Sequence, residues 1–316
     1  MNLSFLSVVT ILHEEKDLNF LSQKLDNLGQ SLALNYKDYE IILVNNLSTH
    51  APESAIEDAD IKVKKHTHLI NLSSKTNRNF AILAGLDRAN GDYSLVLELP
   101  FFEKTDYINQ LFEKTQDGFD LIYLRGIESI QNGSANYLRN LFHSILRNYS
   151  QLQVDPLAHD TRIISRRALN SLLRLRENLR YMKPIYSIIG YRSTFLQTNI
   201  PLVEVRESFD EKFKTSMVAI TSFTTFLSSV ALWILIFSIL MVIIVITNAF
   251  MVKFTNYDLM GTYHEALSGW AFTIVVISIF FSITSLNFYL VLIYLSNIYQ
   301  EIKKRPPYIV ESIKRF

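Results

Sequence analysis

Polar side chains that could do chemistry stand directly after three predicted strands. They are His13 and Glu14, then Asn45 and Asn46, and finally Glu98. Imidazole, amide and carboxylate groups can hydrogen-bond a ligand, and a carboxylate can also bind a hard cation or act as an acid. Because a buried carboxylate without a partner is costly, Glu98 among apolar neighbours favours a site acid over a purely structural residue.

Short β-rich runs alternate with helical patterns through residues 1–125. The predicted strands are Leu3–Leu12, Tyr39–Val44, Ile61–Lys65, Tyr93–Leu97 and Leu121–Leu124, and the predicted helices are Leu18–Leu34, Asn77–Ala89 and Tyr107–Lys114. This alternation indicates an α/β fold built from right-handed βαβ units around a mostly parallel sheet. Ligands of such sheets bind beyond the carboxyl ends of the strands, where the polar residues stand.

Two apolar runs, Leu227–Phe250 and Ala271–Tyr294, contain no charged side chain. Each run has about 24 residues, enough to cross roughly 30 Å of hydrocarbon as a helix with some tilt. The sequence therefore predicts a C-terminal two-helix transmembrane hairpin spanning residues 227–294.

The charges that flank these runs predict their orientation. Five basic residues follow the second run, namely Lys303, Lys304, Arg305, Lys314 and Arg315, whereas the loop between the runs has Lys253 against two acids. The positive-inside rule then places residues 295–316, a basic tail, in the cytoplasm, and two spans return the chain to its starting side. We expect a multi-pass protein of the cytoplasmic (inner) membrane whose soluble domain faces the cytoplasm.

Composition excludes several classes of function. A formal net charge of +1 gives no drive toward nucleic acid, and the lack of cysteine removes disulfides, thiolate metal sites and cysteine nucleophiles. Residues 1–13 have no basic segment and no small-residue cleavage site, so we interpret them as a first strand rather than a signal peptide.

The predicted soluble domain spans residues 1–207 and is joined to the hairpin by an interfacial linker, residues 208–226. Within the domain, residues 136–150 carry an apolar stripe with a basic flank. That pattern is typical of a helix in the lipid headgroup layer, but an ordinary packed helix of the domain has the same pattern, and both interpretations stay open.

Five segments, in order along the chain, carry a resemblance to a known family. They are YEIILVNNLST at 39–49, NF with AGL and GD within 79–92, DTRIISRR at 160–167, Arg206 with Lys212, and KRPPYIV at 304–310. With these segments and two apolar runs, the chain resembles the family 2 glycosyltransferases of GT-A fold. Within that family it resembles the membrane branch that transfers sugars to polyprenyl phosphate, such as dolichyl-phosphate mannose synthase. The resemblance covers essentially the whole length of the chain.

The resemblance implies a reaction and its partners. A sugar would pass from a nucleotide sugar of the UDP or GDP type to polyprenyl (undecaprenyl) phosphate on the cytoplasmic face of the membrane, for cell-surface glycan or lipid modification. The implied cofactor is Mg²⁺ or Mn²⁺, with Glu98 as a weak ligand. A homo-oligomer is left open.

The resemblance also implies roles for individual residues. Glu98 and Asp160 would be the acids at the reacting centre, and His13, Glu14, Asn45 and Asn46 would contact base and ribose. The implied phosphate-binding and acceptor-side cations are Arg78, Arg162, Arg180, Arg206 and Lys212. Arginine suits phosphate oxygens because its guanidinium can bind them bidentately, and lysine acts as a point charge. Without the resemblance, any one of these cations would be interpreted as a solvated or headgroup-facing side chain.

One departure from the family concerns the metal. Glu98-Leu99-Pro100 stands where the family has an Asp-x-Asp pair, and Asn45-Asn46 replaces a pair of aspartates. Proline offers no side-chain oxygen, and one carboxylate binds a hard cation less well than two. Two hypotheses therefore remain: an active transferase with an altered donor site, or a catalytically inactive pseudo-glycosyltransferase that acts as a membrane scaffold or nucleotide-sugar sensor.

Overall fold

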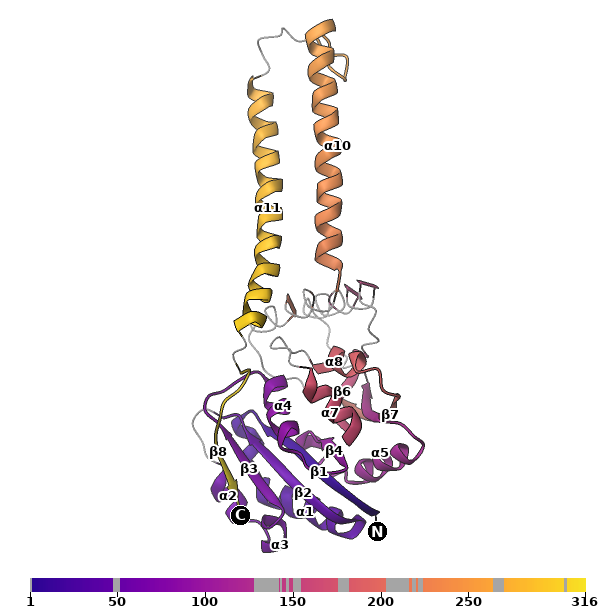
Figure 1. Cartoon of the computed structure of the whole chain (residues 1–316), viewed down its shortest axis with the longest axis vertical. Helices are drawn as coiled ribbons and strands as arrows, with labels where there is room; N and C mark the ends of the chain where they lie inside the picture. The colour runs from indigo at the N-terminus through magenta and orange to yellow at the C-terminus, as the bar shows by residue number, and fades with distance from the viewer. Residues whose placement is uncertain are drawn as a thin grey trace.

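An α/β domain carries two long helices that leave it together (Figure 1). The computed structural model describes residues 2–47, 52–127, 142, 144–145, 148–149, 155–175, 182–202, 216–217, 220, 224–263, 270–303 and 306–316.

The described strands form one sheet in the order β7-β5-β6-β4-β1-β2-β3-β8. Their bounds are β1 Asn2–Leu12, β2 Tyr36–Asn45, β3 Thr67–Leu72, β4 Tyr93–Val96, β5 Leu121–Ile127, β6 Ala158–Ser165, β7 Ser193–Pro201 and β8 Val310–Arg315. β1 lies parallel to β2 and β4, β2 lies parallel to β3, and β6 runs antiparallel to β4. The carboxyl ends of β1, β2 and β4 therefore meet the amino end of β6 at one edge of the sheet.

Helices cover both faces of the sheet. α1 (Leu21–Asn35) and α5 (Asp106–Gln116) pack on one face, while α4 (Arg78–Arg88), α7 (Arg166–Arg174) and α8 (Met182–Ile188) pack on the other. Burial on both faces explains why strands such as β2 are near-continuous apolar runs. The predicted α/β fold with a mostly parallel sheet is confirmed. The shorter described helices are η1 Glu15–Leu18, α2 Glu53–Glu57, α3 Ile61–Lys64 and η2 Leu99–Phe101.

One predicted strand is wrong. Residues 61–64 form the helix α3, and the strand comes later, at β3. The side chain of Asp60 accepts a hydrogen bond from the backbone N–H of Lys62, so the helix has an N-cap. The alternation Ile-Lys-Val-Lys is too short to distinguish a strand from one capped helical turn.

The C-terminal tail contains a strand that the sequence analysis did not predict. β8 pairs antiparallel with β3, and the backbone N–H of Ser73 donates to the carbonyl of Ile309. Asn71 Nδ2 donates to Ser312 Oγ at 3.0 Å. The chain therefore returns from its last helix to the edge of the sheet.

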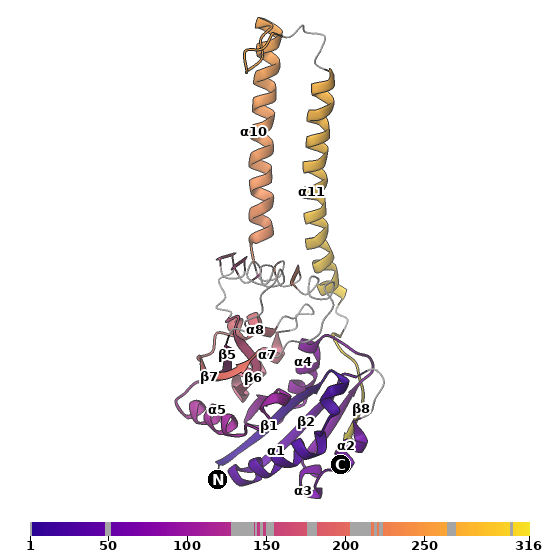
Figure 2. The same ribbon diagram turned by 180° about the vertical axis from the view of Figure 1, so that it is seen from behind.

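The long helices are α10 (Phe226–Thr255) and α11 (Trp270–Lys303), which lie side by side in both views (Figures 1 and 2). Large apolar side chains on both helices are exposed, including Trp233 at 69% and Phe281 at 73%. Among the described residues, Ile279–Ser296 of α11 is long and apolar enough to cross a membrane by length and composition, and the apolar stretch Ser229–Met241 in α10 is shorter. The two-span hairpin stays a prediction.

A small apolar cluster joins the domain to these helices. Ile145, Ile220 and Leu290 are buried together, and the rings of Tyr149 and Phe226 lie 5.1 Å apart, edge to face. The described part of the predicted interfacial helix 136–150 thus packs against the domain-proximal ends of α10 and α11. Its position relative to lipid stays a prediction, as does the role of the linker 208–226, most of which lies outside the described residues.

Candidate functional site

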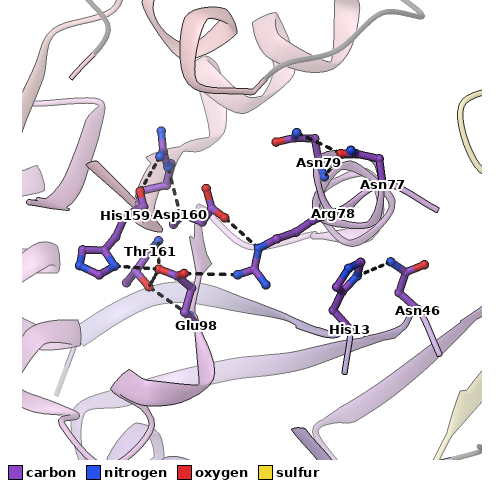
Figure 3. A network of polar contacts seen from close by, with 10 residues as sticks. His13, Asn46, Asn77, Arg78, Asn79, Glu98, His159, Asp160 and Thr161 are labelled. Atoms are coloured by element: carbon purple, nitrogen blue, oxygen red, sulfur yellow. Dashed lines mark hydrogen bonds and ion pairs between the residues drawn. The ribbon is translucent and has the colours of Figure 1, made fainter. Parts of the chain in front are cut away.

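Arg78 lies between two carboxylates at the carboxyl edge of the sheet (Figure 3). Its Nε donates to Asp160 Oδ2 at 2.9 Å, and its Nη2 donates to Glu98 Oε1 at 3.3 Å. Arg78 is the first residue of α4, whose N-cap Asn77 accepts from the backbone N–H of Asn79. The antiparallel pairing of β4 with β6 brings Glu98 and Asp160 to the same guanidinium.

Glu98 is buried, and its oxygens are occupied by donors from the protein. Oε2 accepts from the backbone N–H of Thr161 at 3.2 Å and from its hydroxyl at 3.1 Å, and lies 3.3 Å from His159 Nδ1. The hydroxyl of Thr161 in turn accepts from the backbone N–H of Glu98. Together with the bond from Arg78 to Oε1, these contacts give both oxygens of the buried carboxylate a donor, which is the condition under which burial of a charge is tolerated.

The charges in this cluster influence one another. Burial raises the pKa of Asp160, but Arg78, Lys183 and Arg162 outweigh burial and hold that pKa below its usual range. Burial lowers the pKa of Arg78, and the carboxylates of Asp160 and Glu98 more than reverse that effect. Both groups are therefore charged at neutral pH.

Two further cations face the carboxylates. Arg162 is buried; its Nε and Nη2 donate to the backbone carbonyls of Asp160 and His159, and its guanidinium lies 4.0 Å from the ring centroid of Tyr186. Burial lowers the pKa of Lys183 in α8, an effect that Asp160 opposes and Arg162 reinforces. In the described part of the chain, Arg162 forms no ion pair with a carboxylate within 4.0 Å.

The second group of predicted residues lies beside Arg78. Asn46 Nδ2 donates to the backbone carbonyl of Thr76 and lies 2.8 Å from His13 Nδ1, while Asn46 Oδ1 accepts from the backbone N–H of Thr76. These bonds fix the amide orientation, so His13 Nδ1 acts as an acceptor. Burial, Lys75 and Arg78 lower the pKa of His13, which fits a neutral ring.

Asn45 and Glu14 make contacts that stabilise the fold near the site. Asn45 Nδ2 donates to Asn71 Oδ1 at 2.9 Å, which ties β2 to β3. Glu14 caps η1 and lies 2.7 Å from Lys16 Nζ. Their predicted contacts with base and ribose stay predictions.

The structure brings together Arg78, Glu98, Asp160 and Arg162, and it places His13 with Asn46. Arg180, Arg206 and Lys212 lie outside the described residues. The sequence analysis missed His159, Thr161 and Lys183. Thr161 lies within the DTRIISRR segment, which could have indicated it, but no motif marks Lys183.

The donor set around Glu98 does not fit a divalent cation. Mg²⁺ needs about six oxygen ligands, whereas the oxygens of Glu98 already accept from Arg78 and Thr161. A guanidinium in contact with both Glu98 and Asp160 would also repel a metal ion between them. Across the described ranges, no group of three or more His, Asp or Glu side chains is arranged to hold an ion.

An α/β domain with acids and cations at the carboxyl ends of parallel strands belongs to the class of α/β proteins whose ligands bind there. A sequence model of that class, "Glycosyl transferase family 2", matches residues 7–173, more than half of the chain. The chain belongs to glycosyl transferase family 2, and it is a family 2 glycosyltransferase with a GT-A-like domain.

Relatives align over nearly the whole length. An uncharacterized glycosyltransferase of Synechocystis sp. is 23% identical over 99% of this chain and 96% of its own length. A prophage bactoprenol glucosyl transferase homolog of Escherichia coli is 24% identical over 98% of each chain. Among solved structures, a mannosyltransferase of Pyrobaculum calidifontis in complex with GDP-Man and Mn²⁺ covers 70% of this chain and 62% of its own, at 11% identity and a TM-score of 0.42.

Proposed function

We propose that this protein transfers a sugar from a nucleotide sugar to polyprenyl phosphate at the cytoplasmic face of a membrane. The observation that supports this proposal most is the position of the site on the side of the domain that faces α10 and α11. The carboxyl ends of β1 and β2 point toward the end of the domain from which α10 and α11 extend (Figure 1). A phosphate anchored in a membrane around these helices would lie on the same side as the site.

The named relatives support the acceptor class. They include the bactoprenol glucosyl transferases of Shigella phages SfII and SfX, which are 24% and 23% identical over 88% and 97% of this chain. Bactoprenol is a polyprenol, and a polyprenyl phosphate acceptor lies in a membrane. We include in the proposal that α10 and α11 both span the inner membrane and that the α/β domain is cytoplasmic.

The chemistry suits the charges of the site. An oxygen of the lipid phosphate attacks the anomeric carbon, the bond from that carbon to the diphosphate oxygen breaks, and its electron pair leaves with the nucleoside diphosphate. The attacking oxygen is already an anion at neutral pH, so the reaction needs no strong base. The main requirement is stabilisation of the leaving diphosphate, for which Arg78, Arg162 and Lys183 are available. In this proposal Arg206 and Lys212 bind the lipid phosphate.

The test is a transfer assay with the full chain in lipid vesicles. Labelled UDP- and GDP-sugars are mixed with vesicles that contain undecaprenyl phosphate, and the label is measured in the organic phase. We expect label in the lipid with at least one donor and none when undecaprenol replaces its phosphate. No transfer from any donor would contradict the proposed activity.

A second candidate function rests on the internal contacts of Glu98. Because both oxygens of that carboxylate already accept hydrogen bonds within the protein, a pseudo-glycosyltransferase that binds nucleotide sugar without turnover would keep the same site. Nucleotide binding without transfer, and without slow hydrolysis of the donor, would favour this scaffold or sensor function.

A further inference from the structure

We infer that Arg78 is the built-in cation of the donor site, and that a nucleoside diphosphate binds here without a divalent metal. This inference rests on the proposed function, since it concerns the nucleotide-sugar donor. It also goes beyond that function, because glycosyltransferases of GT-A fold commonly use Mn²⁺ or Mg²⁺.

The contacts of Arg78 leave donors for a phosphate. Bonds to Asp160 and Glu98 use two of the five guanidinium N–H groups, which leaves three for phosphate oxygens. The side chain of Arg78 is 15% exposed, so part of the guanidinium is accessible, and Figure 3 shows it between the two acids and the His13–Asn46 pair. The two acids fix the orientation of the guanidinium, and less side-chain entropy is lost on binding.

The charges of the cluster favour an anion. Arg78 contacts both carboxylates, Arg162 and Lys183 also act on Asp160, and burial lowers the pKa of Lys183. Asp155, which also acts on Lys183, is paired with Arg125 at 3.1 Å. A nearby anion stabilises the charged form of buried basic groups, and a bound diphosphate would supply that anion.

Removal of the Arg78 guanidinium should allow a metal ion to bind. Glu98 and Asp160 contact the same guanidinium, so removal of that guanidinium would leave two carboxylates facing one vacated position. Carboxylate oxygens are the ligands that Mn²⁺ and Mg²⁺ prefer. Replacement of Arg78 by a neutral residue should therefore convert a metal-independent site into a metal-dependent one.

The experiment measures UDP and GDP affinity of the full chain in detergent, by calorimetry, with EDTA and with Mn²⁺. We expect wild-type affinity to differ less than twofold between the two conditions. Arg78→Gln should weaken binding about tenfold to hundredfold in EDTA, the loss of one charged hydrogen bond or more, and Mn²⁺ should restore most of the affinity. Arg88→Ala is the matched control, because Arg88 is an exposed arginine in the last turn of the same helix and should behave as wild type.

The opposite pattern would overturn the inference. A wild-type affinity that rises tenfold or more with Mn²⁺, or an Arg78→Gln variant that binds as wild type in EDTA, would show that Arg78 is not the donor-site cation. If neither nucleotide binds the wild type under any condition, both this inference and the proposed donor are wrong.

A second measurement covers the case in which Arg78→Gln is too unstable for calorimetry. Without nucleotide, Mn²⁺ should raise the thermal unfolding temperature of Arg78→Gln and leave those of wild type and Arg88→Ala unchanged. An equal response of all three proteins to Mn²⁺ would also overturn the inference.

Discussion

Asn46 shows how one amide replaces a carboxylate at this site. Its Nδ2 donates to the Thr76 carbonyl and to His13 Nδ1, and its Oδ1 accepts from the Thr76 N–H. An aspartate could make only the last of these bonds, because an ionised carboxylate has no hydrogen to donate. The sequence therefore supports a neutral His13 rather than an additional acidic ligand.

Asn46→Asp should favour the protonated form of His13 over the neutral form. The new carboxylate beside His13 would favour the protonated ring, so the pKa of His13 should rise above its wild-type value, which burial, Lys75 and Arg78 lower. NMR titration of the histidine resonances measures the shift. Asn90→Asp, an exposed change after α4, is the control, and an unchanged His13 pKa in Asn46→Asp would contradict the contact.

Glu98 should stabilise the fold through its acceptor oxygens as well as through its charge. Glu98→Ala would remove the acceptor of the Thr161 donors and one of the two carboxylates that Arg78 contacts, and breaking a buried ion pair costs about 3–5 kcal/mol. Glu98→Gln keeps an acceptor oxygen and should cost less. Denaturant unfolding of the two variants measures the order, and equal losses would argue against this network.

The Arg78–Asp160 pair predicts acid sensitivity. The pKa of Asp160 is lowered in the folded protein, so the unfolded chain, where it is about 3.9, binds the proton more readily. The stabilisation is therefore complete above about pH 4 and is lost as the pH falls through the lower folded value. Asp160→Asn should flatten the dependence of the unfolding temperature on pH between about 2 and 4, and an unchanged slope would remove Asp160 from the cause.

At the scale of elements, β8 connects the last helix to the sheet. Asn45, Asn71 and Ser312 form a line of hydrogen-bonded side chains across β2, β3 and β8. Lys314 adds an exposed ion pair with Glu53 of α2. The edge of the sheet is thereby covered by a segment that follows α11, which protects β3 from pairing with another chain.

Ser312→Ala and Lys314→Ala separate these contributions. Loss of the Ser312 acceptor should cost about 1 kcal/mol, whereas loss of an exposed ion pair should cost less than about 1 kcal/mol. The measurement is hydrogen exchange of the β3 peptide, residues 67–72. Tryptophan fluorescence would not report on the sheet, because both tryptophans lie in α10 and α11. Faster exchange in Lys314→Ala than in Ser312→Ala would contradict the order.

Periodicity in the sequence was sufficient to predict β1, β2, β4, β5 and the helices α1, α4 and α5. It failed at α3, where four alternating residues follow a helix cap, and at β8, whose exposed and partly basic residues pair with a strand about 240 positions earlier. Glu98, Arg78 and Asp160 were identified one by one, by strand-end position or resemblance. Their mutual contact depends on the antiparallel placement of β6, which local patterns do not determine.

In the whole molecule, the α/β domain and residues 256–263, which follow α10, lie at opposite ends (Figure 2). If both helices span the membrane, cysteines at Met260 and Glu311, both exposed, should be labelled from opposite faces of sealed vesicles. The chain has no native cysteine to interfere. Labelling of both from one face would exclude the two-span arrangement.

In the proposed mechanism, the resident cations of this protein, Arg78 foremost, support sugar transfer to a lipid phosphate. The most direct test of this mechanism is the initial rate of label transfer from nucleotide sugar to undecaprenyl phosphate in vesicles, measured in EDTA for wild type, Arg78→Gln and Arg88→Ala. We expect wild type and Arg88→Ala to transfer at equal rates in EDTA, and Arg78→Gln to lose transfer there and to regain it in part with Mn²⁺. Transfer by the wild type that stops in EDTA and returns with Mn²⁺ would contradict the account.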